Sequence, residues 1–543
     1  MRKRKWSSRL KTIKPTFPIH PLLFAVFPVL FLYSHNIQEV LPDVVIKPLI
    51  AVTIFTFVLV AILNFLIINR EKAALLSSLF IVLFFSYGHV ANLISDFTYK
   101  VGAISIGKYK LLFSAWIITF ILGVFLLNKV KRNLKALTNF LTIVSAALVI
   151  FSLLNIGFYE LKTKRLGRVF ESNTPTEDLS ASKGNNSKRL DIYYLIFDRY
   201  AANNTLQEFY GYDNSNFTNY LKDKGFYVAS KASANYPITA PSLASSLNMR
   251  YINFLTNKAG EDSSDKTLVY PMLQDYKVWR TLKSRGYKFF HLGSYWQPTK
   301  VNRYADQVFI PEDTSIPVDE FSAKLLETTI ISRFTADILP GTTASDTGSV
   351  TGSINKYREA TLRQFDLLAQ IPKIEGPKFI FAHILLPHPP YVFGTNCEAK
   401  EKVDPKIVND KKSYLAQLAC TNKKIKLLLD QIFAGSKKPP IIILQADEGP
   451  YPASFNPTNN FRLRWASPEV LKEKLRILNA YFLPGIKNNQ LYSTITPVNS
   501  FRLIFNLYLG TKYELLPDKN YIFEDINHLY KYIDVTNVVK SSK

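Results

Sequence analysis

The feature that most constrains this chain is a series of five apolar segments within its first 156 residues. Most approach the ~20 residues that a helix needs to cross a bilayer, and none has a charged residue in its middle. A signal peptide does not explain the region, because apolar spans keep recurring. The sequence therefore predicts a transmembrane domain of about five spans over residues 1–158. The segments are Pro18–Tyr33, Ile46–Ile68, Ala74–Ile94, Leu111–Leu127 and Leu137–Ile156.

Basic residues beside these segments predict their orientation. Residues 1–14 contain seven basic residues and no acidic one, and residues 128–136 contain four basic residues. Loops rich in Lys and Arg stay on the cytoplasmic side, so the N-terminus and the loops after the second and fourth segments are expected inside. The basic loop before Leu111 weakens this contrast without reversing it. An odd number of spans then predicts a multi-pass protein of the cell membrane with an extracytoplasmic C-terminal domain.

The rest of the chain divides into a connection and one large domain. Residues 159–170 are basic and partly apolar, which is typical of the membrane surface, and residues 171–189 have the polar composition of a linker. From residue 190 to 543, strand-like apolar runs alternate with helical patterns that end at glycines such as Gly225 and Gly286. The alternation predicts an α/β domain with a largely parallel sheet. Residues 343–353 are expected to form a mobile loop.

The formal net charge of +25 favours anionic partners such as acidic lipid head groups, polyphosphates or nucleic acid. No nucleic-acid-binding motif is present, and the apolar first third favours membrane lipids instead. The two cysteines, Cys397 and Cys420, both lie in the part expected outside the cytoplasm. A disulfide can persist there, so we expect them to pair, although two free thiols would also fit the sequence.

Two strand-like runs end in carboxylates. Ile441–Pro450 reads IIILQADEGP, so Asp447 and Glu448 follow four aliphatic residues, and Asp191–Tyr200 reads DIYYLIFDRY and ends at Asp198. Carboxylates at the ends of buried strands suit a hard cation or an anion-handling site. A solvated turn would give the same pattern at either run alone. Two such runs in one domain predict a single site at one edge of a sheet.

A hydroxyl residue stands near a predicted helix start in Asn235–Met249, NYPITAPSLASSLNM. Pro241 suits the first helical turn, so Thr239 is expected just before the helix N-terminus. A hydroxyl there faces exposed backbone N–H groups and the positive end of the helix dipole. A phosphoryl or sulfuryl ester formed on it would be stabilised. Thr239 could equally be an ordinary N-cap.

These three stretches, in this order, resemble the alkaline phosphatase/sulfatase superfamily. With five spans, the chain is similar to its membrane-anchored branch of lipoteichoic acid synthases and phosphoethanolamine transferases. The resemblance implies that Asp198, Thr239 and Asp447 bind a metal ion and that Thr239 is the nucleophile. Glu448 stands where the family has His or Asn, so it either binds the metal as a carboxylate or marks a degenerate enzyme. Carboxylates and a hydroxyl favour Mn²⁺, Mg²⁺ or Ca²⁺ over Zn²⁺.

The residues after the expected nucleophile distinguish two branches of the superfamily. Sulfatases carry Cys or Ser followed by x-Pro-x-Arg, and the Cys or Ser is oxidised to formylglycine. Here Pro241 is kept, Thr239 replaces the Cys and Leu243 replaces the Arg. Because threonine is not the residue that this maturation acts on, the resemblance implies phosphoryl-group transfer through a phosphothreonine rather than sulfatase activity.

The histidines of the stretch FAHILLPHPPY are the remaining catalytic candidates. His388, at the expected strand exit, can bind a substrate phosphate or protonate a leaving alkoxide. His383 can do the same or be a core histidine. His291 and His528 are weaker candidates. No late metal-binding histidine that superfamily members often have is recognisable.

Two functions follow from these residues. The first is a metal-dependent phosphoryl-group transferase, or a phosphoester or sulfoester hydrolase, that acts on an anionic lipid-linked or glycan substrate. The second is a degenerate membrane protein of the same fold that binds anionic envelope components with its basic C-terminal domain. Arg199 also has two possible roles in the sequence, because it could pair with Asp198 or bind an anion.

Overall fold

The computed structural model describes residues 18–37, 40, 42–94, 98–101, 104–131, 133–172, 189–311, 320–331, 350–452 and 462–541. The chain forms two compact units. The first, here called the helical unit, comprises Met1–Lys162 and Val318–Gly348, and the second, the sheet unit, comprises Thr163–Pro317 and Ser349–Lys543. The described residues 320–331, which the sequence places within the C-terminal domain, therefore cluster with the first unit.

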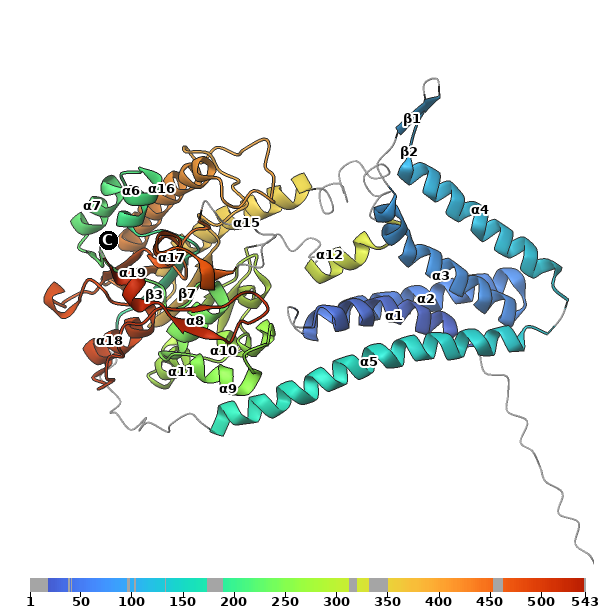
Figure 1. Cartoon of the computed structure of the whole chain (residues 1–543), viewed down its shortest axis with the longest axis horizontal. Coiled ribbons are helices and arrows are strands. Elements are labelled where there is room, and N and C mark those ends of the chain that lie inside the picture. Colours follow the sequence, from blue (N-terminus) through green and yellow to red (C-terminus); the bar gives the residue numbers. More distant parts are fainter. Residues whose placement is uncertain are drawn as a thin grey trace, which may run out of the picture. The chain divides into compact units, whose positions relative to one another are not determined.

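Each of the five apolar segments coincides with a helix (Figure 1). Four helices, α2 to α5, are long and apolar enough to cross a membrane by length and composition, and α1 is a shorter apolar helix. The last helix runs on to Ser172, so the stretch 159–170 continues it. The expected linker is outside the described residues from 173 to 188. The helices are α1 His20–His35, α2 Ile46–Ile67, α3 Arg70–Leu93, α4 Lys108–Lys129 and α5 Lys135–Ser172.

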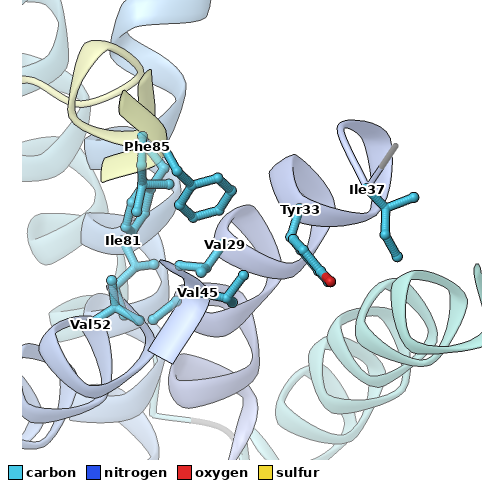
Figure 2. Packing of buried hydrophobic residues seen from close by; sticks show 10 residues of the cluster. Val29, Tyr33, Ile37, Val45, Val52, Ile81 and Phe85 are labelled. Atoms are coloured by element: carbon cyan, nitrogen blue, oxygen red, sulfur yellow. The ribbon is translucent and has the colours of Figure 1, made fainter. Parts of the chain in front are cut away.

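The first three helices pack through one apolar cluster (Figure 2). Val29 of α1, Val52 of α2 and Phe85 of α3 are among its buried members. Elsewhere on the five helices large apolar side chains stay exposed, such as Phe65 on α2 and Leu126 on α4. Such exposure is costly in water but not in lipid, whose chains are as apolar as these residues. The helical unit thus has apolar side chains both in its core and on its surface, as a membrane domain does.

The sheet unit is built on seven strands in the order β4-β9-β8-β3-β7-β5-β6. Strands β8, β3, β7, β5 and β6 run parallel, whereas β9 is antiparallel to both β8 and β4. Every residue of β3, β7 and β8 is buried, which explains why their sequences are mostly apolar. The predicted α/β domain with a largely parallel sheet is confirmed. The strands are β3 Ile192–Phe197, β4 Tyr227–Val228, β5 Lys288–Leu292, β6 Gln307–Phe309, β7 Lys378–Ile384, β8 Ile441–Gln445 and β9 Asn479–Phe482.

Helices alternate with these strands along the chain, as expected. Gly225 and Gly286 follow α7 and α11 with φ of +89° and +79°, a backbone that favours glycine. The predicted loop at 343–353 lies outside the described residues up to 349, and its last residues begin α15. The longer helices are α6 Asn203–Tyr210, α7 Ser215–Asp223, α8 Thr239–Asn248, α11 Lys277–Ser284, α15 Val350–Gln370, α16 Lys411–Gly435, α17 Pro468–Leu475 and α18 Pro497–Leu509.

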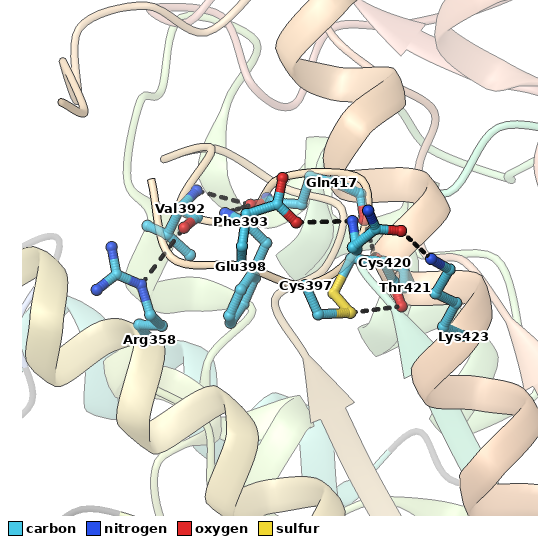
Figure 3. The surroundings of a disulfide bond; sticks show 10 residues. Arg358, Val392, Phe393, Cys397, Glu398, Gln417, Cys420, Thr421 and Lys423 are labelled. Carbon is cyan, nitrogen blue, oxygen red and sulfur yellow. Dashed lines mark hydrogen bonds between the residues drawn. A yellow bond between two sulfur atoms is a disulfide. The ribbon is translucent and has the colours of Figure 1, made fainter. Parts of the chain in front are cut away.

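Cys397 and Cys420 form a disulfide that ties the loop after β7 to α16 (Figure 3). The side chain of Gln417, also on α16, fastens the same loop. It accepts hydrogen bonds from the backbone N–H groups of Val392 and Phe393 and donates one to the carbonyl oxygen of His388. The loop that carries His388 is therefore held by a covalent bond and by several hydrogen bonds.

Candidate functional site

Three neighbouring parallel strands bring acidic and imidazole side chains to one edge of the sheet. Asp198 directly follows β3, Asp447 comes two residues after the end of β8, and His383 is the next-to-last residue of β7. The register pairs Ile196 of β3 with His383 and with Gln445, so Asp198 and Asp447, each two residues further on, start from one level, and His383 starts two residues before it. One ligand atom from each lies within 4.8 Å of the others, and all three residues are buried.

One polar atom of each cluster residue has no hydrogen bond among the described residues, although Nε2 of His383 lies 3.5 Å from Oδ2 of Asp198. Oδ1 of Asp198, Oδ2 of Asp447 and Nε2 of His383 are buried without a hydrogen bond. The opposite nitrogen of the imidazole, Nδ1, lies 2.9 Å from the hydroxyl of Thr299, which orients the ring. Buried polar atoms are normally satisfied. Three unsatisfied atoms that converge from different strands fit a divalent cation better than they fit protein packing.

The electrostatics of Asp447 agree with this interpretation. Burial, followed by the negative charges of Asp198 and Glu448, raises the pKa of the Asp447 carboxyl well above its usual value, and the Thr239 hydroxyl opposes the rise. Two carboxylates held this close repel each other in a dry site. A cation between them would relieve that repulsion.

Thr239 is the first residue of α8, whereas the sequence predicted that it would come just before the helix. Ile238 occupies the N-cap position, and the ordinary N-cap role for Thr239 is therefore wrong. Its hydroxyl instead donates a 3.4 Å hydrogen bond to Oε1 of Glu448. The hydroxyl of Ser242, in the first turn, donates to the backbone carbonyl of Asp447 at 2.6 Å. These bonds hold the N-terminus of α8 against the end of β8.

Glu448, the fourth predicted ligand, is surrounded by cations of the protein. Nη2 of Arg199 lies 3.0 Å from its Oε1, and Nζ of Lys474 contacts its Oε2. Burial lowers the pKa of Lys474 to about 8, although Glu448 opposes the change. Because both of its oxygens already have positive partners, Glu448 is the least available of the predicted metal ligands.

Arg199 is held in an unusual conformation beside the cluster. Its φ is +64°, a left-handed backbone that non-glycine residues seldom adopt. Its guanidinium stacks on the ring of Tyr451 at 3.4 Å, and its Nε lies 3.8 Å from Oδ1 of Asp198. Nε and Nη1 are buried without a hydrogen-bond acceptor among the described residues. Arg199 therefore pairs mainly with Glu448 and keeps two N–H groups for another acceptor.

His388 lies next to this arrangement, in the loop after β7. Its ring is 6.4 Å from that of Tyr451, and its charge would interact with Asp198. Burial lowers the pKa of His388 to about 4. Nδ1 faces the carbonyl oxygen of Pro389, which only accepts, so the neutral ring carries its proton on Nδ1. Nε2 is then the basic nitrogen.

The two weaker histidine candidates have structural partners. His291 is buried on β5, and its Nε2 donates to the carbonyl of Thr299 at 2.9 Å. The hydroxyl of the same threonine contacts His383, so Thr299 lies between the two histidines. His528 pairs with Asp525 at 2.7 Å and is not part of the cluster.

Two residues of the site were not recognised in the sequence. Tyr451 follows the Asp447–Pro450 stretch closely, so its position was a usable signal. Lys474 lies in the stretch KEKLR, which resembles a solvated helix face, and nothing in the sequence distinguishes it from such a face.

One of the comparisons with known proteins shows a family. The sulfatase family model matches residues 194–498, more than half of the 543 residues, and this range includes Asp198, Thr239, His383 and Asp447. No curated protein matches the chain.

Several solved structures are similar to the chain at low identity. The C-terminal periplasmic domain of EcEptC from Escherichia coli is 13% identical, with a TM-score of 0.40, over 66% of this chain and 94% of that one. The integral membrane protein lipooligosaccharide phosphoethanolamine transferase A (EptA) from Neisseria meningitidis is 10% identical, with a TM-score of 0.37, over 90% and 95%. An alkaline phosphatase superfamily protein from Vibrio parahaemolyticus is 11% identical, with a TM-score of 0.36, over 67% and 81%.

Proposed function

The chain belongs to the sulfatase family, and we propose that it is a metal-dependent enzyme of the cell membrane that transfers or hydrolyses a phosphoryl group. One observation carries the proposal. Three buried residues, Asp198, His383 and Asp447, offer ligand atoms within 4.8 Å of one another, and each has a buried polar atom without a hydrogen bond among the described residues. Such an arrangement is stable only if something positive completes it.

Asp198, Asp447 and His383 would hold a divalent cation, with the Thr239 hydroxyl beside it. This set adds His383 to the ligands expected from the sequence and gives Glu448 a different role. When bound, the ion would supply Lewis-acid stabilisation of the transferred group and lower the pKa of the hydroxyl. Two carboxylates and one imidazole suit Mn²⁺ or Mg²⁺ and also accommodate Zn²⁺.

Thr239 is the proposed nucleophile. Its hydroxyl already donates to Glu448, and it begins α8, where free backbone N–H groups stabilise an anion. Its oxygen would form a bond to phosphorus and its proton would pass to the departing oxygen as the bond between phosphorus and that oxygen breaks, giving a phosphothreonine. An acceptor hydroxyl or water then attacks the phosphorus and releases Thr239.

His388 and Arg199 complete the proposed machinery. At neutral pH the His388 ring is uncharged and its Nε2 is basic, so it suits removal of the proton from the second nucleophile. The two unpartnered N–H groups of Arg199 would bind non-bridging oxygens of the phosphoryl group. Glu448, Lys474 and Tyr451 would keep the guanidinium in place.

The substrate we propose is an anionic lipid-linked molecule or glycan of the cell envelope. We infer from the apolar helices that the protein lies in a membrane, and from the basic-residue pattern that the sheet unit is outside the cytoplasm, with α1 as a fifth span. The disulfide supports an oxidising compartment for the sheet unit. A basic surface suits anionic substrates.

A second candidate function is a non-catalytic binder of anionic envelope components. The observation that favours it is the pair of cations on Glu448, since this carboxylate stands where the family has a metal-binding His or Asn. In that case Lys474 and Arg199 would replace a metal ion, and the basic surface would do the binding.

Metal content and covalent labelling distinguish the two functions. We expect the purified full chain to bind one divalent ion per molecule and to lose it in Asp447→Asn, but not in the control Asp525→Asn, which lies outside the cluster. Incubation with a lipid phosphodiester should add a phosphoryl mass to the wild type and not to Thr239→Ala. A metal-free chain of normal stability, or full turnover by Thr239→Ala, would refute the enzyme.

A further inference from the structure

A short segment that lies between two sheet-unit elements in sequence packs in the helical unit instead. The helix α12, Glu320–Glu327, comes after β6 and before α15. Phe321 and Leu325, four residues apart and thus on one face, are both buried in the cluster formed by α1, α2 and α3. Figure 2 shows this part of the cluster, with α12 in yellow beside Phe85.

The residues after α12 make backbone hydrogen bonds to α3. The N–H of Gly88 donates to the carbonyl of Thr328 at 2.9 Å, and the N–H of Ile330 donates to the carbonyl of Phe84 at 3.2 Å. Positions 84 and 88 are the two partners of one hydrogen bond in a regular α-helix. The segment therefore bonds both the donor and the acceptor of one such residue pair, which fixes its position along α3.

Gly88 makes this approach possible. A Cβ atom at position 88 would lie 2.1 Å from the carbonyl oxygen of Glu327 and 2.8 Å from Cα of Thr328. Both are backbone atoms, so no side chain could move aside to make room. Beyond the glycine, Ile330 packs against a second cluster of the helical unit that includes Tyr87, Ala91 and Leu112. The contact combines apolar packing on two clusters with paired backbone bonds.

We propose that residues 320–331 are a docking arm by which the sheet unit holds the helical unit without a covalent bond. The chain passes between the units at three places, after Lys162, after Pro317 and after Gly348. The arm leaves the sheet unit at the second and returns at the third, so whatever holds the arm also holds the sheet unit. Its partner is the surface of α1 and α3 around Gly88, rather than lipid. The proposal does not depend on the proposed chemistry.

The test uses the full chain in sealed membrane vesicles with the sheet unit facing the protease. A protease recognition sequence is inserted between residues 172 and 189, cut, and the vesicles are washed in high salt and sedimented. The C-terminal fragment of the wild type should stay in the pellet. In Gly88→Ala the added methyl group should displace the arm, and the fragment should appear in the supernatant several-fold more. Gly157→Ala on α5 is the matched control, because a Cβ there meets nothing within 4 Å.

A second variant reaches the same contact from the other side. Ile330→Pro removes the N–H that bonds Phe84 and leaves α1 to α5 unaltered. It should release the fragment as Gly88→Ala does. Retention in both variants would mean that the arm binds lipid or that other contacts hold the sheet unit, and the proposal would be wrong. Release of the wild-type fragment by the wash would also overturn it.

Discussion

Nη2 of Arg199 lies 3.0 Å from Oε1 of Glu448, and both side chains are buried. Lys474, equally buried, contacts the other oxygen of the same carboxylate. The carboxylate that the family resemblance assigns to metal binding thus joins two cations of the protein. One of them, Arg199, faces the candidate metal cluster with two N–H groups that have no acceptor among the described residues. Glu448 thus orients an arginine beside the candidate metal cluster.

Removing one member of this buried group should be strongly destabilising. We expect Lys474→Met to lower the free energy of unfolding by about 3–5 kcal/mol, because a buried charge then loses a partner. Adding Glu448→Gln to Lys474→Met should restore part of the loss, since the uncompensated charge is removed. Urea unfolding of the four proteins of the cycle measures the coupling. Lys437→Met is the control, because its pair with Glu375 is 85% and 83% exposed, so its loss should barely change the free energy of unfolding.

Metal removal should expose the repulsion between Asp198 and Asp447. The pKa of Asp447 is raised, so its contribution to stability is present below its unfolded pKa of 3.8 and is lost as pH rises through the folded value. The chelated wild type should therefore melt lower at neutral pH than chelated Asp447→Asn. Added Mn²⁺ should raise the melting temperature of the wild type and leave the variant unchanged. An identical response of both proteins to chelator and to Mn²⁺ would contradict the site.

His291 should make the sheet unit acid-sensitive. Burial lowers its pKa from 6.5 to about 4, so stability that is present above pH 6.5 is lost as pH falls toward 4. The loss is on the order of 3 kcal/mol at most, at about 1.4 kcal/mol per pH unit. His291→Phe should flatten this part of the stability curve, as measured by denaturant unfolding across the range. An unchanged slope would show that other groups dominate.

Arg199→Lys should separate anion binding from metal binding. A lysine keeps the charge but lacks the planar fork that presents several N–H groups together. We expect inorganic phosphate to bind about tenfold more weakly or worse, because a charge-assisted hydrogen bond contributes roughly 1.5–3 kcal/mol. Metal affinity should be unchanged, since Arg199 is not among the clustered ligand atoms. Arg280→Lys, in an exposed pair with Asp275, is the control and should affect neither. Equal weakening of phosphate and metal would show a merely structural defect.

Local sequence patterns predicted most of the fold. Long apolar runs identified the helices of the helical unit, because their signal needs no knowledge of distant partners. The apolar sequence of β3 and the four aliphatic residues of β8 predicted buried parallel strands, and the carboxylates that follow predicted that Asp198 and Asp447 would meet. Gly225 and Gly286 marked helix ends correctly for a local steric reason.

What the sequence did not reveal depends on tertiary contacts. Lys474 is buried in an ion pair with Glu448, whereas its neighbours in the sequence resemble a solvated surface. The ring of His383 is oriented by Thr299, which lies in the connection between β5 and β6. The helix α12 is amphipathic in either unit, so only its packing on α1 and α3 could assign it.

The position of β3 has a consequence for biosynthesis. This first strand of the sheet lies between β7 and β8, which are made much later, at residues 378–384 and 441–445. Until they emerge from the ribosome, both edges of an apolar ribbon lack hydrogen-bond partners, and such delayed long-range pairing is slow and prone to aggregation. The nascent polypeptide should therefore recruit a chaperone between the insertion of its helices and the completion of its sheet.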